Sequence, residues 1–408
     1  MFKQSLLLFT LGIALLFSQP AGADAEQRRQ AKRIHDRLTG IPPGETVLSE
    51  MEILLADSTG GKSAAELAME NAAFYNVTLK NFVAPWTNEE QSVFVPLNDY
   101  SATVIGMIRD DVDFREILYG DILYTGNNSP AYANTNNLHY ESLETLGPIA
   151  GNLADDTILT RQTQSAVSGL DSAATAGIMT SRAASRAFFH LGTNRAMFRF
   201  TLINHLCTDL EPLKDNSRIP DRVHQDVTRS PGGDSRIYLN SCVGCHAGMD
   251  GMMGAFAHYE LEFTEDSDGN VIEDTAQLIY TPATVQAKFL INENNFKPGF
   301  ITTDDSWINY WRNGQNALLG WSNSSPGVVL DEKGHATGNG AKSLGVELAN
   351  SDAFAQCQVK KAFQAVCLRE PGDTADRSEV NSIVTDFKSG GYRMKQVFRD
   401  VAAYCKGS

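Results

Sequence analysis

The chain has 408 residues, 42% of them hydrophobic, and its 49 acidic and 34 basic residues give a formal net charge of −15. A chain of this length exceeds one hydrophobic core, so two or three domains are expected. The acidic balance argues against nucleic acid and anionic membrane surfaces as partners.

The first 23 residues have the pattern of a cleavable signal peptide. Lys3 supplies the positive charge, residues 6–17 form a mostly apolar run, and Ala21-Gly22-Ala23 has the small residues of a cleavage site. The run is shorter than an ordinary membrane span, and no later stretch reaches 18 apolar residues. We therefore expect cleavage after Ala23, a periplasmic or secreted protein, and no membrane span in the mature chain.

Helical spacing then appears in two places before a long polar stretch. Residues 26–40 carry Ile34 and Leu38 on one face. Ser63 is a suitable N-cap for a second helix that continues through Leu67 and Phe74. Residues 125–165 are rich in Asn, Ser, Thr and Tyr and have little periodicity, which predicts a long surface loop or linker.

Helices are expected to resume after this stretch and to lead to a motif near the middle of the chain. Apolar residues at three- and four-residue spacing predict helices over 183–190 and 195–207. A polar loop rich in Pro, Asp and Arg follows at 211–236. A short helix carrying Tyr238 and Leu239 should then enter the motif.

The motif is Cys242-Val243-Gly244-Cys245-His246, the C-x-x-C-H signature of c-type haem attachment. Two thiols one helical turn apart can form thioether bonds to the two vinyl groups of one porphyrin. The next side chain can then place its imidazole on the iron as the proximal ligand. The motif predicts one covalent haem c, held by Cys242, Cys245 and His246.

Three other uses of such a motif fit the sequence less well. A zinc site would require a second pair of ligands, yet the remaining four cysteines form no C-x-x-C pair. A thioredoxin-like pair would require a βαβ setting, and Cys242 follows a polar loop instead. A disulfide between Cys242 and Cys245 would leave His246 without a role.

Beyond the motif, residues 249–259 are rich in Gly and Met, which suits close contact with a flat apolar cofactor. Residues 265–270 predict a tight turn between two short strands, and residues 322–342 a polar loop. The last 65 residues predict three helices, at 343–369 with a break near Asn350, at 377–389 and at 391–405.

The four remaining cysteines form an even set, and an oxidising compartment favours two disulfides among three connectivities. Cys357 and Cys367 would lie ~15 Å apart along one helix, too far to bridge. The alternatives are Cys207–Cys357 with Cys367–Cys405, and the crossed pairing. The first is preferred because it ties the C-terminal helices to each other and to the helix ending at Cys207.

Three passages resemble the planctomycete-type cytochrome c proteins of unknown function, which are secreted bacterial haem proteins built from a fixed order of modules. The first runs from Gly177-Ile178-Met179-Thr180 through Asn194-Arg195 to Leu206-Cys207. The second is the haem motif with its Met249-Asp250 extension. The third comprises Phe354-Ala355-Gln356-Cys357 and Gly391-Tyr392-Arg393. The resemblance implies a helical fold and covalent haem.

Several side chains are candidates for the sixth iron ligand. The favoured ones are His190 and His258, and five-coordinate iron is also open. His205 is a further candidate histidine. The methionines are expected to pack on the porphyrin or in the core rather than bind iron, and they are Met249, Met252, Met253 and Met394.

The expected fold class is mainly α, a multi-domain helical protein with a cytochrome c-like haem module and a C-terminal helical bundle. The expected function is single-electron transfer by a periplasmic or secreted monohaem cytochrome that docks a redox partner protein. The alternatives are a haem enzyme, oxidase or peroxidase-like, with an open distal position, and a binding protein with structural haem. Hydrolase motifs are absent from the sequence.

The expected segments are a signal peptide (1–23), an N-terminal helical region (24–165), a helical region with the haem motif (166–262), a loop-rich region with short strands (263–342) and a C-terminal helical module (343–408).

Overall fold

The computed structural model describes residues 21–190, 192–223, 235–290 and 299–407. The chain is 55% helical and 8% strand, so the prediction of a mainly α fold is confirmed. Residues 1–20 of the expected signal peptide lie outside the described residues, and the first helix begins at Ala21.

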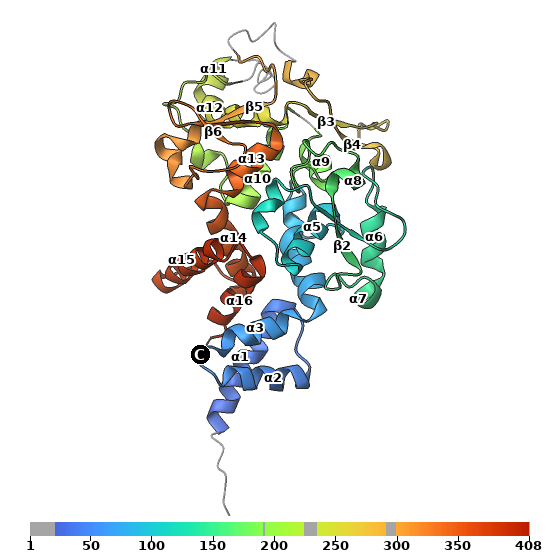
Figure 1. Cartoon of the computed structure of the whole chain (residues 1–408), viewed down its shortest axis with the longest axis vertical. Helices are drawn as coiled ribbons and strands as arrows, with labels where there is room; N and C mark the ends of the chain where they lie inside the picture. Colours follow the sequence, from blue (N-terminus) through green and yellow to red (C-terminus); the bar gives the residue numbers. More distant parts are fainter. Residues whose placement is uncertain (1–20, 191, 224–234, 291–298, 408) are drawn as a thin grey trace, which may run out of the picture.

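Helices are found from one end of the molecule to the other in Figure 1, and several, such as α2 (Glu45–Leu55) and α15 (Thr374–Ser389), lie across its long axis. Short 3-10 and π turns extend several of them. The α-helices named in the following paragraphs are Ala21–Thr39 (α1), Glu45–Leu55 (α2), Gly60–Met69 (α3), Asp99–Arg109 (α5), Leu138–Thr145 (α6), Arg182–Phe188 (α9), Arg195–Thr201 (α10), Ser235–Ile237 (α11), Val243–Met253 (α12), Gly340–Ala349 (α13), Asp352–Cys367 (α14), Thr374–Ser389 (α15) and Met394–Tyr404 (α16). Shorter α-helices are Lys80–Val83 (α4), Gly147–Ala150 (α7) and Gln164–Ser168 (α8).

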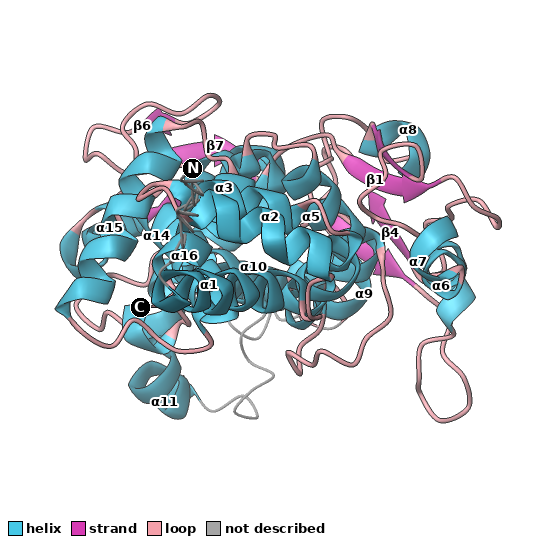
Figure 2. Ribbon diagram, turned by 90° about the horizontal axis from the view of Figure 1, so that it is seen from below, coloured by secondary structure: helices cyan, strands magenta, loops and turns pink. Residues whose placement is uncertain are grey.

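Three small antiparallel sheets lie at the periphery of the helical centre (Figure 2). Two are strand pairs, and in the third β7 lies between β5 and β6. The strands are Leu123–Gly126 (β1) with Leu159–Gln162 (β2), Tyr259–Glu262 (β3) with Gln277–Tyr280 (β4), and Ser306–Asn309 (β5), Val329–Leu330 (β6) and Ala336–Asn339 (β7). The predicted turn at 265–270 lies between β3 and β4, as expected.

The first helix confirms the sequence prediction, but the second prediction began at the wrong residue. Ile34 and Leu38 of α1 are buried. The structure places α2 where none was predicted, and α3 starts at Gly60 rather than after Ser63. A Cβ atom on Gly60 would lie 1.8 Å from the Leu54 carbonyl oxygen, so the close turn from α2 into α3 requires glycine.

The prediction of a long loop over 125–165 was wrong, because this stretch contains α6, β2 and α7. Helix α6 is held by polar and aromatic contacts, so its sequence shows no clear hydrophobic periodicity. The Tyr140 hydroxyl donates to the Tyr124 carbonyl at 2.8 Å, and His139 Nε2 accepts from the Gly126 amide at 2.9 Å. The predicted polar loop at 322–342 likewise contains β6 and β7.

The disulfides follow the preferred pairing. Cys207 is bonded to Cys357, and Cys367 to Cys405, with Cα–Cα distances of 5.2 and 5.6 Å.

The predicted break between two helices near Asn350 is confirmed, because α13 ends at Ala349 and α14 begins at Asp352. Buried apolar side chains form a contiguous core from Ala31 to Ala402. The domain boundaries stay a prediction.

Only part of the C-terminal helical region lies close to the C-x-x-C-H helix. Helix α13 packs against the 3-10 turn Gly254–Phe256 that continues α12. Helix α16 packs instead against α14, α3 and α1. Figure 1 shows α16 beside the N-terminal helices, with α12 near the opposite end of the molecule.

Candidate haem-attachment site

The C-x-x-C-H motif lies at the start of helix α12. A π turn, Tyr238–Cys242, leads from α11 into α12, and Cys242 is the N-cap residue. The predicted short helix before the motif is therefore confirmed. At 3.6 residues per turn, Cys242, Cys245 and His246 share one side of the helix, while Gly244, Gly248 and Gly251 share the other.

The side of α12 that carries the glycines packs closely against β5 and Trp311 of the same chain. A Cβ atom on Gly248 would lie 1.9 Å from Nε1 of Trp311, and one on Gly251 would lie 2.8 Å from the Ile308 carbonyl oxygen. Of these two glycines, only Gly251 belongs to the stretch 249–259 expected to contact a cofactor, and it faces β5 instead. The two glycines bring α12 against β5 and Trp311, and this packing directs the thiol side away from the core.

The two thiols of the motif remain free while the other four cysteines form disulfides. Both are partly buried, and Cys245 Sγ lies 3.6 Å from the Leu210 carbonyl oxygen. Burial raises the pKa of the Cys245 thiol, with opposing and reinforcing contributions from nearby charges. Cys242 and Val243 pack on a small apolar cluster of Val223 and Tyr238, separate from the main core.

His246 is oriented by a buried carboxylate. Its Nδ1 lies 3.1 Å from Oδ1 of Asp250, one helical turn later, and its side chain is 21% exposed. The Tyr238 ring lies edge-on to the imidazole at a centroid distance of 5.4 Å. A histidine held through Nδ1 presents Nε2 for coordination, the usual arrangement of a metal-binding imidazole and its supporting carboxylate.

Asp250 is itself fixed by an arginine from α10. Arg195 donates from Nε and Nη2 to the two carboxylate oxygens at 3.0 Å each, and Arg195 also contacts the Thr193 hydroxyl. Burial acts to raise the pKa of Asp250, but the charges of Arg195 and His246 outweigh it and hold that pKa well below its ordinary range. Asp250 therefore remains an acceptor for the imidazole N–H.

This pair of supporting residues was not identified as functional from the sequence. In the sequence, Asp250 and Arg195 were noted only as members of the passages that resemble the cytochrome family. The i, i+4 spacing of His246 and Asp250 on a helix is the signal that places them face to face. The partner of that carboxylate, Arg195, lies 55 residues earlier and carries no local signal.

The two favoured candidates for the sixth iron ligand, His190 and His258, have different neighbours in the structure. His190 follows α9, packs edge-on against Phe263, and lines a cavity of about 580 Å³ with residues of α6 and α9. His258 is buried, and its Nδ1 lies 3.5 Å from Oδ2 of Asp305. His246 lies near the start of α12, whereas His258 lies beyond its C-terminal end, after the 3-10 turn Gly254–Phe256.

The other candidates belong to the core. His205 is fully buried, and its Nε2 lies 2.9 Å from the Tyr100 hydroxyl oxygen. Burial lowers its pKa well below the ordinary value. The expectation that methionines serve packing is met in the main core by the buried side chains of Met249, Met252, Met253 and Met394.

Five cavities lined by described residues have walls that include none of Cys242, Cys245 and His246. Within the described ranges, no group of three or more His, Cys, Asp or Glu side chains could hold a metal ion. No helix there is both long and apolar enough to cross a membrane.

Comparison with protein-family models, with curated proteins and with solved structures finds no match to this chain.

Proposed function

We propose that the chain is a c-type cytochrome in which Cys242 and Cys245 attach one haem and His246 is the proximal iron ligand. The observation that carries the proposal is the arrangement around α12. Two free thiols and an imidazole held by Asp250 lie on one side of a helix whose other side is fixed by Trp311. These donors fit haem c, which takes two thioether bonds and one neutral imidazole.

In this proposal the protein side chains have separate tasks. Haem bound at the motif would supply one reversible electron per iron. Asp250 accepts the Nδ1 proton of His246 and so fixes the tautomer that leaves Nε2 as the ligand atom. Arg195 holds the carboxylate in place. Tyr238 and Val223 offer apolar contact beside Cys242.

Attachment outside the cytoplasm fits the remaining sequence features. A signal peptide, two disulfides and the resemblance to planctomycete-type cytochromes all favour a periplasmic or secreted protein. The proposed partner is a redox protein that exchanges one electron with the haem. The assignment of a haem module and a C-terminal helical module belongs to the same proposal.

The test is expression of the full chain with a functional haem-ligation system. The purified protein should have the mass of a chain starting at Asp24 with one covalently bound haem. The single variants Cys242→Ala and Cys245→Ala should each keep at most one thioether, which the spectrum of the denatured ferrous haem reports. The double variant should lose covalent haem. A wild-type mass equal to the apoprotein alone would contradict the proposal.

The optical spectrum with carbon monoxide separates the roles. A six-coordinate ferrous protein that does not bind CO and has a reversible potential supports electron transfer. Rapid CO binding with turnover of peroxide or an organic substrate would favour a haem enzyme instead. A haem that neither binds CO nor cycles between two oxidation states would be structural.

A further inference from the structure

A concave site on α1 has a charge opposite to that of the whole molecule. Its volume is about 790 Å³, and its walls are α1, the segment from Val77 to Phe82, and the C-terminal end of α14. Four of its twelve lining residues are cations, namely Arg29, Lys32, Arg33 and Arg37, and one is an acid, Asp36. A net charge of −15 for the chain makes this concentration of positive charge a local exception.

Three of these cations lie on one side of α1. Arg29, Arg33 and Arg37 are four residues apart, so their side chains emerge in a row about 12 Å long. Within the described ranges no carboxylate lies at ion-pair distance from any of the three. The adjacent Arg28 faces the other way and pairs with Glu45 and Glu52 at 2.8 and 2.7 Å.

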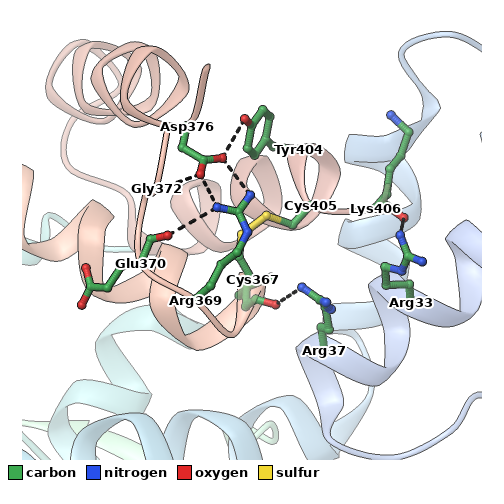
Figure 3. The surroundings of a disulfide bond; sticks show 11 residues. Arg33, Arg37, Cys367, Arg369, Glu370, Gly372, Asp376, Tyr404, Cys405 and Lys406 are labelled. Carbon is green, nitrogen blue, oxygen red and sulfur yellow. Dashed lines mark hydrogen bonds and ion pairs between the residues drawn. A yellow bond between two sulfur atoms is a disulfide. The ribbon is translucent and has the colours of Figure 1, made fainter. Parts of the chain in front are cut away.

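Two of these guanidinium groups, those of Arg33 and Arg37, donate to main-chain carbonyls instead. Arg37 Nη1 donates to the Val366 carbonyl at 3.1 Å, and Arg33 Nη1 donates to that of Lys406 at 3.0 Å. Figure 3 shows both side chains reaching from α1 towards the chain around the Cys367–Cys405 disulfide, with Arg369 on the far side. Burial, and then the charges of Arg33 and Arg369, lower the pKa of Arg37. Arg33 and Arg37 therefore add positive charge to the cleft, whereas Arg369 is paired with Asp376 and the acid of the cleft, Asp36, is paired with Lys32.

The rest of the wall combines apolar side chains with the polar residues Thr78 and Asn81. Leu368 ends α14 and is 72% exposed, and Val77 is 40% exposed. Phe82 and Ala365 complete this surface. A row of arginines beside exposed hydrocarbon is complementary to a molecule with an acidic head group and an apolar tail, and the volume suits a ligand of that size.

We propose that this cleft binds a single anionic amphiphile, with its phosphate or carboxylate head group on Arg29, Arg33 and Arg37 and its hydrocarbon tail on Val77, Phe82 and Leu368. Helix α1, which lines the cleft, lies towards the opposite end of the molecule from α12 (Figure 1). The proposal therefore stands independently of the proposed haem. The acidic surface elsewhere disfavours a flat anionic membrane as the partner, whereas a single molecule enters the local positive field.

The test is calorimetric titration of the full mature chain with dodecyl phosphate below its aggregation concentration. Sodium dodecanoate is the second probe, and it shows whether a carboxylate head group suffices. We expect one molecule per chain. Dodecyl maltoside, which has the same tail without charge, and inorganic phosphate, which has no tail, should each bind at least about tenfold more weakly.

Variants locate the site. Arg29→Gln and Arg33→Gln should each weaken binding of dodecyl phosphate about tenfold. Leu368→Ser should weaken it without changing the affinity for inorganic phosphate. Arg28→Gln is the matched control, adjacent on the same helix but facing Glu45 and Glu52, and should leave affinity unchanged. Thermal unfolding of each variant, with Tm near that of the wild type, shows that the fold is kept.

Three outcomes would overturn the proposal. The first is failure of both charged probes to bind. The second is equal weakening by Arg28→Gln and Arg29→Gln, which would indicate a diffuse charge effect. The third is binding to phosphatidylglycerol vesicles with none to the monomeric amphiphile, which would indicate a membrane-contact surface.

Discussion

At the scale of single residues, the candidate haem site depends on a buried ion pair that orients an imidazole. Asp250 has no exposed side-chain surface, whereas its partner Arg195 is 19% exposed. The chain also has a comparable pair at its surface. Arg199 and Asp209 form two hydrogen bonds at 2.8 and 2.7 Å, with side chains 47% and 40% exposed. The two pairs differ in burial, and Asp250 has His246 as a further partner.

Replacing Asp250 by Asn should therefore cost far more stability than replacing Asp209 by Asn. Breaking a buried pair leaves an uncompensated charge and costs about 3 kcal/mol, whereas an exposed pair contributes less than about 1 kcal/mol. Urea unfolding of both variants measures the difference. Equal losses would show that Asp250 contributes no more than a surface carboxylate.

His205 should make stability depend on pH. In the folded chain, burial lowers its pKa well below 6.5, and Lys361 acts in the same direction. Below about pH 6.5 the unfolded chain binds a proton that the folded chain does not, so the free energy of unfolding falls by up to about 1.4 kcal/mol per pH unit. His35, which is also buried with a lowered pKa, adds to this trend.

The measurement is the free energy of unfolding of the wild type and of His205→Gln between pH 4 and 8. Glutamine can keep a polar contact with the Tyr100 hydroxyl and does not titrate. The variant should lose part of the acid-side slope and keep the part that His35 contributes. Parallel curves for the two proteins would contradict the assignment to His205.

At the scale of elements, α12 is positioned by its glycines. The thiols and His246 can face outward only because Gly248 and Gly251 let the opposite side of the helix lie against Trp311 and β5. The position of α12 therefore depends on the close approach of its backbone to Trp311 and β5, which side chains at Gly248 and Gly251 would prevent.

Gly248→Ala should destabilise the protein by about 2 to 3 kcal/mol, since its new methyl group would overlap Trp311 Nε1. Gly372→Ala is the control, because a Cβ atom there has no neighbour closer than 3.9 Å and the backbone is not left-handed. Thermal unfolding compares the two variants. A Gly248→Ala protein as stable as the control would mean that α12 moves freely on β5.

The sequence predicted well those elements whose buried side chains repeat at helical spacing. Residues Ile34 and Leu38 of α1, and the break near Asn350, are examples. It failed for α6, because His139 and Tyr140 are buried there through hydrogen bonds that follow no hydrophobic period. In the candidate site, the local motif predicts the proposed ligands, whereas the role of Arg195 becomes visible only in the folded chain.

At the scale of the whole molecule, the two disulfides join parts of the chain that are far apart in sequence. Cys207–Cys357 closes a separation of 150 residues, whereas Cys367–Cys405 closes one of 38 and holds α14 against the end of α16. The Cys207–Cys357 disulfide therefore reduces the conformational entropy of the unfolded chain more than Cys367–Cys405 does.

Removing each disulfide by a pair of Cys→Ala changes should reflect this difference. Loop-closure entropy gives about 5 kcal/mol for the longer loop and about 4 kcal/mol for the shorter. Urea unfolding of Cys207→Ala/Cys357→Ala and of Cys367→Ala/Cys405→Ala measures both losses. A larger loss for the second pair would show that native contacts around α16 outweigh the entropy of the unfolded chain.

The contact of α16 with α1 and α3 has a consequence for the order of events in biosynthesis. Gly61 of α3 lies against Ala403, so the first helices are buried by the last one. Between Met69 and Met394 lie 324 residues, which a ribosome adds in roughly 15 to 65 s at ~5–20 residues per second. For that time α1 and α3 lack the part of their cover that α16 provides. In the proposed export of this chain, completing this end of the core last would keep the N-terminal helices incompletely packed during passage through the export channel.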